Sequence, residues 1–419
     1  MKSSAALFAS AIILGQAAHA QTTWTVPTSA PTVRAAVQLA SPGDTITMLP
    51  NATDLVGDVV IDKAVTLESC RISFPDNAFG IRITGMIGGD RITLRNVSVT
   101  PSGSGFFQHI PEAQGVHIDV PAQAHGIIVL DSVTARGAKM VPGNQGLLVA
   151  RLGSVGFLAR NCSFSGASGD IPFLSSGETG PPGGSGVALQ SPGLYLFENC
   201  TFEGGRGGNA WWDTFSWFRA SAGGPAITAS MGTIALVDCD LVEGDGGNAG
   251  GATSSPPPNP CAFAAQPGQS SLPTDLYGVS LQPGRPGSVQ GCATSYPTPP
   301  LRHLGAATDL IVPVSSLRVN TPITIHSMSL GPAQGFTGLL AGFPLRRSVL
   351  PGVSGSLWID QIVWTGLLPP PDPTGWCTFA LPPVPAVIGT PIELRLQPVH
   401  VANNLVIVLG SPRSITVVP

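Results

Sequence analysis

The sequence is poor in charge, and its few charges are balanced. The 419 residues include 20 lysines and arginines against 24 aspartates and glutamates, so charged residues make up only 11% of the chain. A basic cluster is also lacking, which excludes the electrostatic signature of a nucleic-acid partner or of an anionic membrane surface. Because hydrophobic residues reach 43%, the composition excludes a disordered chain as well.

The sequence has no apolar run long enough to cross a bilayer. The stretch 5–14 is the main candidate, and it lies between Lys2 and Ala18-His19-Ala20. This is the order of a signal peptide and its cleavage site. We therefore expect residues 1–20 to be removed on export. The protein is then secreted or held at the cell surface, without membrane insertion.

The cysteines lack the C-x-x-C spacing that marks a structural zinc site, and we expect no metal or other cofactor. Two of the seven, Cys261 and Cys292, bracket a proline-rich stretch. They are the expected disulfide, since export permits one. Cys162, Cys200 and Cys239 fall at regular intervals, and we expect them to stack as small buried side chains.

Repetition and turn residues are what the sequence has in abundance. The segments Leu158–Phe164, Leu196–Phe202 and Leu236–Leu241 are nearly the same, and their cysteines recur every 38 to 39 residues. The chain also holds 52 glycines and 41 prolines, which indicates many turns. A period of this length predicts a solenoid, in which each unit buries its apolar face on its neighbours.

Each repeat shows two short segments with alternating apolar residues, which predict strands with one face inward. The first strands begin near residues 59, 81, 116, 147, 187 and 226, and the second strands near 65, 92, 127, 155, 194 and 234. Repeats grow from 22 residues to about 40. We therefore expect a fixed coil with insertions on its flank.

The region before the repeats predicts a short helix over 32–40, with Thr32 as N-cap, then a turn and a strand from Thr45. This opening, with Ser-Pro-Gly-Asp-Thr-Ile-Thr at 41–47, resembles pectin-lyase-like right-handed parallel β-helix proteins. Later segments such as 92–99 resemble that family's coil pattern. The resemblance spans about residues 24–250 and implies the fold. It implies no single activity, because the scaffold hosts lyases, hydrolases and adhesins.

The pattern changes after residue 250. Residues 251–301 are rich in proline and glycine and are expected to form a linker or a cap. Residues 302–419 show seven short apolar segments, which predict an antiparallel β-sandwich. These expected strands are 316–320, 323–330, 338–343, 355–364, 377–381, 392–396 and 405–409. The predicted fold class is all-β, a right-handed parallel β-helix followed by a small antiparallel β-sandwich.

An aromatic insertion at 209–219 is the first candidate site. Its candidate ligand-binding residues are Trp211, Trp212, Asp213, Trp217 and Arg219. Exposed aromatic rings beside polar groups suit sugar rings or a partner surface. The alternative is a loop that buries its own rings.

Three evenly spaced histidines with one carboxylate are a second candidate. His109, His117 and His125, with Asp119, carry groups that bind divalent ions. The spacing is not one that metal sites use, so surface histidines are the alternative.

Acidic residues decide whether the chain is an enzyme. The resemblance implies catalysis by clustered carboxylates, with an arginine or lysine in lyases. Here the strands hold few acids. Glu198 and Asp238 are predicted to occupy matching places on second strands, with Arg160 as the equivalent one coil earlier. We interpret this row as an outward salt-bridged ladder rather than a catalytic set.

Glycine-rich stretches at 204–209 and 244–248 occupy equivalent positions. Calcium binding is one interpretation because of Asp245, but the calcium-binding nonapeptide pattern is missing. We expect tight corners of the coil instead.

The sequence therefore predicts an exported surface-binding or structural protein, with polysaccharide or cell-surface glycan as the candidate partner. A polysaccharide lyase or glycoside hydrolase of the pectin-lyase-like class is the alternative. A third interpretation is that the protein is an exported matrix element that binds no ligand. Neither the catalytic residues nor the oligomeric state can be assigned from the sequence.

Overall fold

The structure is a computed structural model. It describes residues 21–55, 57–75, 78–87, 89, 91–102, 113–138, 144–169, 182–208, 223–247, 274–277, 279–282, 301–303, 308–311, 316–318, 320–329, 335–343, 353–354, 357–359, 361–369, 376–381, 383, 391–402, 407–409 and 412–418.

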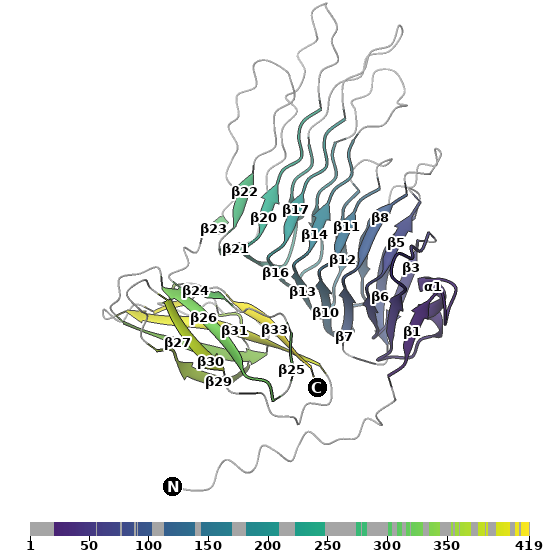
Figure 1. Ribbon diagram of the computed structural model, residues 1–419. Helices are drawn as coiled ribbons and strands as arrows, with labels where there is room; N and C mark the ends of the chain where they lie inside the picture. Colours follow the sequence, from purple (N-terminus) through teal and green to yellow (C-terminus); the bar gives the residue numbers. More distant parts are fainter. Residues whose placement is uncertain are drawn as a thin grey trace, which may run out of the picture.

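The amino-terminal part is a right-handed parallel β-helix, as predicted, built from three parallel sheets (Figure 1). Sheet A contains β1 (Thr23–Val26), β2 (Thr45–Met48), β4 (Thr66–Glu68), β7 (Arg91–Arg95), β10 (His125–Asp131), β13 (Ser154–Arg160), β16 (Leu194–Glu198), β19 (Thr233–Val237), β21 (Thr274–Tyr277) and β23 (Leu301–His303). Sheet B contains β5 (Arg71–Phe74), β8 (Ser98–Pro101), β11 (Thr134–Arg136), β14 (Ser163–Ser165), β17 (Thr201–Glu203), β20 (Asp240–Val242) and β22 (Ser280–Gln282). Sheet C contains β3 (Val59–Lys63), β6 (Ile81–Ile87), β9 (Val116–Asp119), β12 (Leu147–Arg151), β15 (Val187–Leu189) and β18 (Ile227–Ala229).

Each complete coil has three strands, not the two that the sequence pattern predicted. The chain runs from sheet C to sheet A and then to sheet B, and the predicted first and second strands are those of sheets C and A. The strands of sheet B were missed. All seven span only three or four residues, which is too short for alternation to stand out.

Inward side chains stack in rows from coil to coil, and one row explains the cysteines. It holds, in coil order, Cys70, Val97, Val133, Cys162, Cys200 and Cys239, each one residue before the paired first residues of sheet B. All six are buried, and the four cysteines are free thiols, which confirms the predicted stacking. The Cys200 thiol lies 3.6 Å from the carbonyl oxygen of Ala159. Burial raises its pKa well above the ordinary value, which favours the neutral thiol over the reactive thiolate.

The first coil is closed by α1 (Val33–Leu39), whose N-cap Thr32 accepts a hydrogen bond from the Ala35 amide, as predicted. Val33, Ala36 and Val37 form its buried face. The helix therefore covers the open end of the amino-terminal coils.

Asp44 holds this cap in place. Its carboxylate accepts hydrogen bonds from the Thr22 amide at 2.9 Å, the Trp24 indole at 3.0 Å and the Ser41 amide at 2.9 Å. Burial would raise the pKa of this carboxyl. The three hydrogen bonds outweigh burial and hold the pKa below its ordinary value of 3.8.

Asp44→Asn is expected to lower the free energy of unfolding by about 1–3 kcal/mol near neutral pH, because an amide cannot accept all three bonds. The depressed pKa means that the contribution of ionised Asp44 is complete above its unfolded-state pKa and disappears as pH falls through the folded-state pKa. The difference between wild type and variant should therefore shrink in acid. Urea titrations of wild type and variant, from neutral pH to below the folded-state pKa of Asp44, check this prediction. A stability difference that stays constant in acid would contradict it.

The carboxy-terminal part is a β-sandwich of two sheets. One contains β24 (Thr308–Ile311), β26 (Ile323–Ser329) and β30 (Trp376–Leu381). The other, sheet E, has β25 (Ser316–Arg318), β33 (Arg413–Val418), β31 (Ile392–Ala402), β27 (Gly335–Phe343) and β29 (Gln361–Leu367) side by side, with β28 (Val353–Ser354) and β32 (Ile407–Leu409) attached. Within the described residues of the sandwich, β24, β28 and β33 are strands that the pattern did not predict. The strand predicted over 355–364 corresponds to β29, which begins only at Gln361.

The sandwich packs against the outer face of sheet A. Trp358 is fully buried on the outward side chains of the middle coils. Those are Val129, Leu158, Leu196, Ala235 and Val237. Polar contacts surround this patch. Arg91 pairs with Glu393 at 2.8 Å, and Arg160 donates to the Thr416 hydroxyl at 2.8 Å. Sheet A is thus buried on both faces where the sandwich covers it.

The glycine-rich corners are more than tight turns. Where the chain leaves sheet B and returns to sheet C, outgoing and returning segments alternate in one hydrogen-bonded stack. Its amide-to-carbonyl bonds run from Gly184 to Ala167, from Gly205 to Gly184, from Gly224 to Gly205 and from Gly244 to Gly224, at 2.7–2.9 Å. A Cβ on Gly205 would lie 1.8 Å from the Ala167 carbonyl oxygen. Only glycine fits so close to a neighbouring backbone.

Candidate functional site: a polar groove beside sheet B

The turn from sheet A to sheet B carries a row of exposed or half-buried polar residues. One residue per coil adopts a left-handed backbone with φ between 49° and 57°. These are Ser69, Asn96, Ser132, Asn161, Asn199 and Asp238. Asparagine and aspartate tolerate this conformation better than most residues. Neighbours also bond to one another, since the Asn199 amide donates to Asn161 Oδ1 at 2.8 Å.

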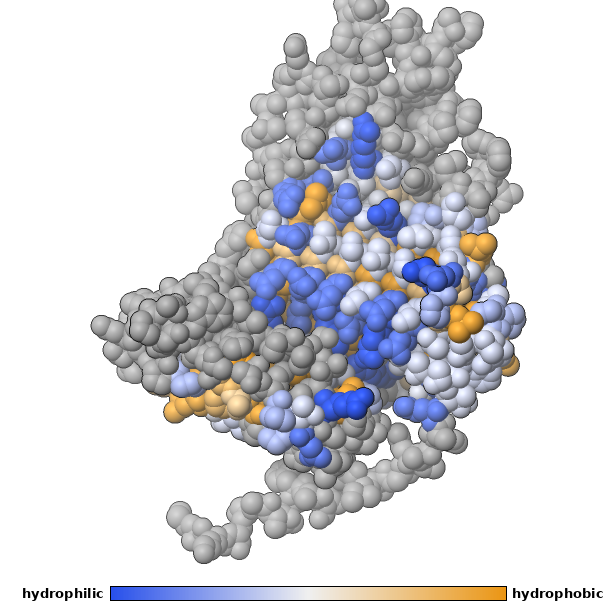
Figure 2. Space-filling model, viewed as in Figure 1, coloured by the Kyte–Doolittle hydropathy of each residue, from blue (hydrophilic) through white to orange (hydrophobic). Residues whose placement is uncertain are grey.

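Two further rows, polar except for Val242, follow on the outer face of sheet B. The first, in register, is Arg71, Ser98, Thr134, Ser163, Thr201, Asp240 and Ser280. The second is Ser73, Thr100, Arg136, Ser165, Glu203, Val242 and Gln282, two positions along each strand. Figure 2 views this face, where blue and pale side chains lie over the coils. Neighbouring strands lie about 4.8 Å apart, so the face repeats hydroxyl groups at that interval.

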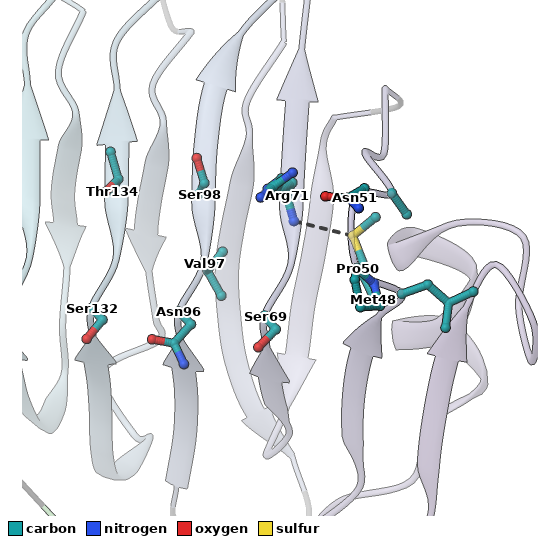
Figure 3. A pocket seen from close by; sticks show the side chains of 12 residues that line it. Met48, Pro50, Asn51, Ser69, Arg71, Asn96, Val97, Ser98, Ser132 and Thr134 are labelled. Carbon is teal, nitrogen blue, oxygen red and sulfur yellow. Dashed lines mark hydrogen bonds between the residues drawn. The ribbon is translucent and has the colours of Figure 1, made fainter.

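A groove of about 450 Å³ opens at the amino-terminal end of these rows. Figure 3 shows Ser69, Asn96 and Ser132 in the row at the turn and Arg71, Ser98 and Thr134 in the row beyond. The end of the groove is formed by Met48, Leu49, Pro50, Asn51 and Ala52. The Met48 sulfur accepts a hydrogen bond from the Arg71 amide at 3.3 Å. This bond joins the loop after β2 to the start of sheet B.

The chemistry of the groove is that of a binding surface. Its lining contains one charged side chain, the exposed Arg71, and its other polar groups are hydroxyls and amides. These groups both donate and accept hydrogen bonds. The loop residues at its end add apolar surface, with Leu49 45% exposed. Such a lining suits a ligand with many hydroxyl groups.

The candidate residues of the aromatic insertion, Trp211, Trp212, Asp213, Trp217 and Arg219, lie outside the described residues. The insertion connects β17 to β18. The described chain stops at Gly208 and resumes at Gly223, both in or beside the glycine stack. The insertion therefore leaves from the far edge of sheet B, in the fifth complete coil. The Cys261–Cys292 pairing and His109 also lie outside the described residues.

The remaining residues of the histidine candidate lie on two sheets and in different surroundings. His117 is buried on sheet C and stacks on Phe79 with ring centroids 4.9 Å apart. Asp119 pairs with Arg151 at 2.8 Å, and His125 is exposed at the start of β10 in sheet A. Within the described part of the chain, no three histidine, cysteine or acidic side chains are grouped closely enough to hold a metal ion.

The predicted ladder exists, but its register differs from the prediction. Glu198 pairs with Arg160 on one side and with Val237 on the other, so Asp238 is one residue too late and belongs to the left-handed turn. The prediction was wrong because it matched the two residues by charge. Arg160 and Glu198 stand two residues before their cysteines, whereas Asp238 stands one residue before Cys239, so Val237 takes the equivalent position. The observed row is Glu68, Arg95, Asp131, Arg160 and Glu198, with alternating sign.

The middle of this ladder lies under the sandwich rather than in solvent. Arg160 is 2% exposed and Glu198 is 5% exposed. Arg160 lies 2.9 Å from Asp131 and 3.8 Å from Glu393. Burial raises the pKa of Glu198, although Arg413, Arg395 and Arg160 oppose the shift. Burial likewise lowers the pKa of Arg395 to about 10. These groups join the two parts of the chain, and a ligand cannot reach them without undocking.

Sequence reasoning missed the groove, because its residues come from four separate segments that meet only through the coil register. The left-handed residues were a usable signal, since four of the six precede an inward Cys in an Asn-Cys, Asp-Cys or Ser-Cys pair.

No helix in the described residues is long and apolar enough to cross a membrane. No family model matches the chain, and no curated protein matches it.

Proposed function

We propose that the protein binds an extended, hydroxyl-rich polymer, a polysaccharide or cell-surface glycan, along the outer face of sheet B. The observation that supports this most is the groove at Arg71, which opens onto in-register rows of serine and threonine. A sugar chain offers repeated hydroxyls of both hydrogen-bonding senses, and the rows offer matching partners at a regular interval.

The aromatic insertion fits the same proposal. It leaves the coil at the edge of sheet B, so Trp211, Trp212 and Trp217 would add ring-stacking surface beside the hydroxyl rows. Asp213 and Arg219 would add hydrogen bonds to hydroxyls. The proposal includes export by the segment 1–20 and places the binding face on a pectin-lyase-like scaffold.

Glycan binding is testable with two sets of variants. On an array of microbial and plant glycans, Arg71→Ala is expected to weaken binding at least about tenfold, since hydrogen bonds to a charged group are worth more than neutral ones. Arg151→Ala removes an exposed arginine from sheet C and should leave binding unchanged. Trp211→Ala with Trp217→Ala should weaken binding separately. Binding that survives all of these changes rules out both surfaces.

The alternative function is that of a lyase or hydrolase, and the same protein samples test it. If unsaturated products form from uronate polymers, or reducing ends are released from neutral ones, the function is catalysis rather than binding. Because Glu198 and Arg160 are covered by the sandwich, such activity would have to arise elsewhere on the chain.

A further inference from the structure

The outer strand of the sandwich, β29, presents an uncharged and exposed edge. It is the last strand of sheet E, paired with β27 on one side, and no described strand pairs with its other side. Most of its residues are exposed, including Ile362 at 48%, Val363 at 52% and Leu367 at 68%. Neither charge nor proline interrupts the seven residues of β29. Edge strands are ordinarily protected by such residues against pairing with another chain.

Apolar surface continues from this edge onto the adjacent strand. Phe336 on β27 is 54% exposed, and β27 also lacks charged residues. Figure 2 shows hydrophobic side chains gathered on the lower margin of the sandwich, where Figure 1 places β29. Scattered single apolar residues are normal on surfaces, whereas a contiguous group beside a free edge indicates an interaction site.

The edge lies on the part of sheet E that the β-helix leaves uncovered. The β-helix contacts β31 through Glu393 and β33 through Thr416. The strand order places β27 between β31 and β29. The exposed patch thus continues the face that docks on sheet A, and a partner can reach β29 without displacing the docked sandwich.

We propose that β29 pairs with β29 of a second copy of this chain, forming a two-fold symmetric dimer through an antiparallel strand pair. A copy of itself fits because antiparallel self-pairing of an uncharged strand places no like charges opposite each other. The backbone edge supplies the hydrogen bonds, and the exposed side chains of β27 and β29 supply the apolar contact.

The interface is small, so we expect a dimer with a dissociation constant in the micromolar range. Light scattering coupled to gel filtration over a concentration series should show the mass rise from monomer to dimer. Val363→Lys is expected to weaken dimerisation at least about tenfold, because it places two charges at the paired edges. Ile87→Lys changes a similarly exposed residue, 65% exposed on β6 of the β-helix, and should dimerise like wild type.

A second measurement separates loss of pairing from loss of fold. Amide exchange in β29 should slow as protein concentration rises, with β6 unaffected, and this change should be absent in Val363→Lys. Circular dichroism melting should coincide for wild type and both variants. A protein that stays monomeric at all concentrations, or a Val363→Lys variant that dimerises normally, overturns the proposal. Dependence of dimerisation on added glycan would instead point to the sheet B face.

Discussion

Arg160→Met is expected to lower the free energy of unfolding by about 3–5 kcal/mol, the usual cost of removing one partner from a buried ion pair. The substitution leaves Asp131 and Glu393 buried, 6% and 5% exposed, without the cation between them. It also removes the bond to Thr416. Because Arg160 joins the β-helix to the sandwich, the sandwich should loosen first. Urea titration followed by tryptophan fluorescence measures the loss of stability, and amide exchange in β31 and β33 shows whether it begins in the sandwich.

Arg151→Met is the matched control. Arg151 lies 2.8 Å from Asp119, close to the 2.9 Å between Arg160 and Asp131. The side chains of Arg151 and Asp119 are, however, 55% and 39% exposed. Exposed ion pairs contribute about 0–1 kcal/mol. Equal losses for Arg160→Met and Arg151→Met would show that the sandwich does not bury the ladder. The conclusion that this row is structural would then fail.

Gly205→Ala is expected to cost about 3 kcal/mol or more, at the upper end of overpacking effects. Its Cβ would lie 1.8 Å from the Ala167 carbonyl oxygen, and the facing atoms belong to hydrogen-bonded backbone that cannot rotate away. To make room, the stack must open, which breaks the bonds between Gly184, Gly205 and Gly224. Thermal melting and amide exchange of residues 204–208 would report the change.

Gly156→Ala provides the comparison for the same chemical change. Its Cβ would lie 3.7 Å from the Gly126 carbonyl oxygen and from a side-chain carbon of Ile127, which is ordinary contact. The variant should be within about 0.5 kcal/mol of wild type. A tolerated Gly205→Ala would mean that the glycine stack is not packed as described.

The β-helix could be predicted because its inward rows repeat in the sequence, as Cys162, Cys200 and Cys239 do. The docked sandwich left a signal too. Strands buried on both faces read as continuous apolar runs, and Ile127–Leu130 and Ile234–Val237 read in this way. Alternating apolar and polar residues were expected in these strands, so the outward apolar residues were not interpreted as a second buried face.

The groove depends on register, and the register is lost when residues are matched by charge rather than by the repeated cysteines. Asp238 and Glu198 illustrate the difficulty, since a shift of one moves a side chain from the ladder to the turn. The β33 strand was missed for another reason. Ser414 and Thr416 alternate there with Ile415 and Val417, but both polar side chains are buried, because β33 lies inside sheet E between β25 and β31 and docks on the β-helix through Thr416.

The corner between sheets B and C has a consequence for engineering. The connections of very different length, 102–115, 137–146, 166–186 and 204–226, all depart from this one corner, while the strands of sheet C that follow them begin in register. The coil therefore accepts added length there without rearrangement. Foreign peptides grafted at successive corners would be displayed as an array whose anchor points follow the rise of the coil.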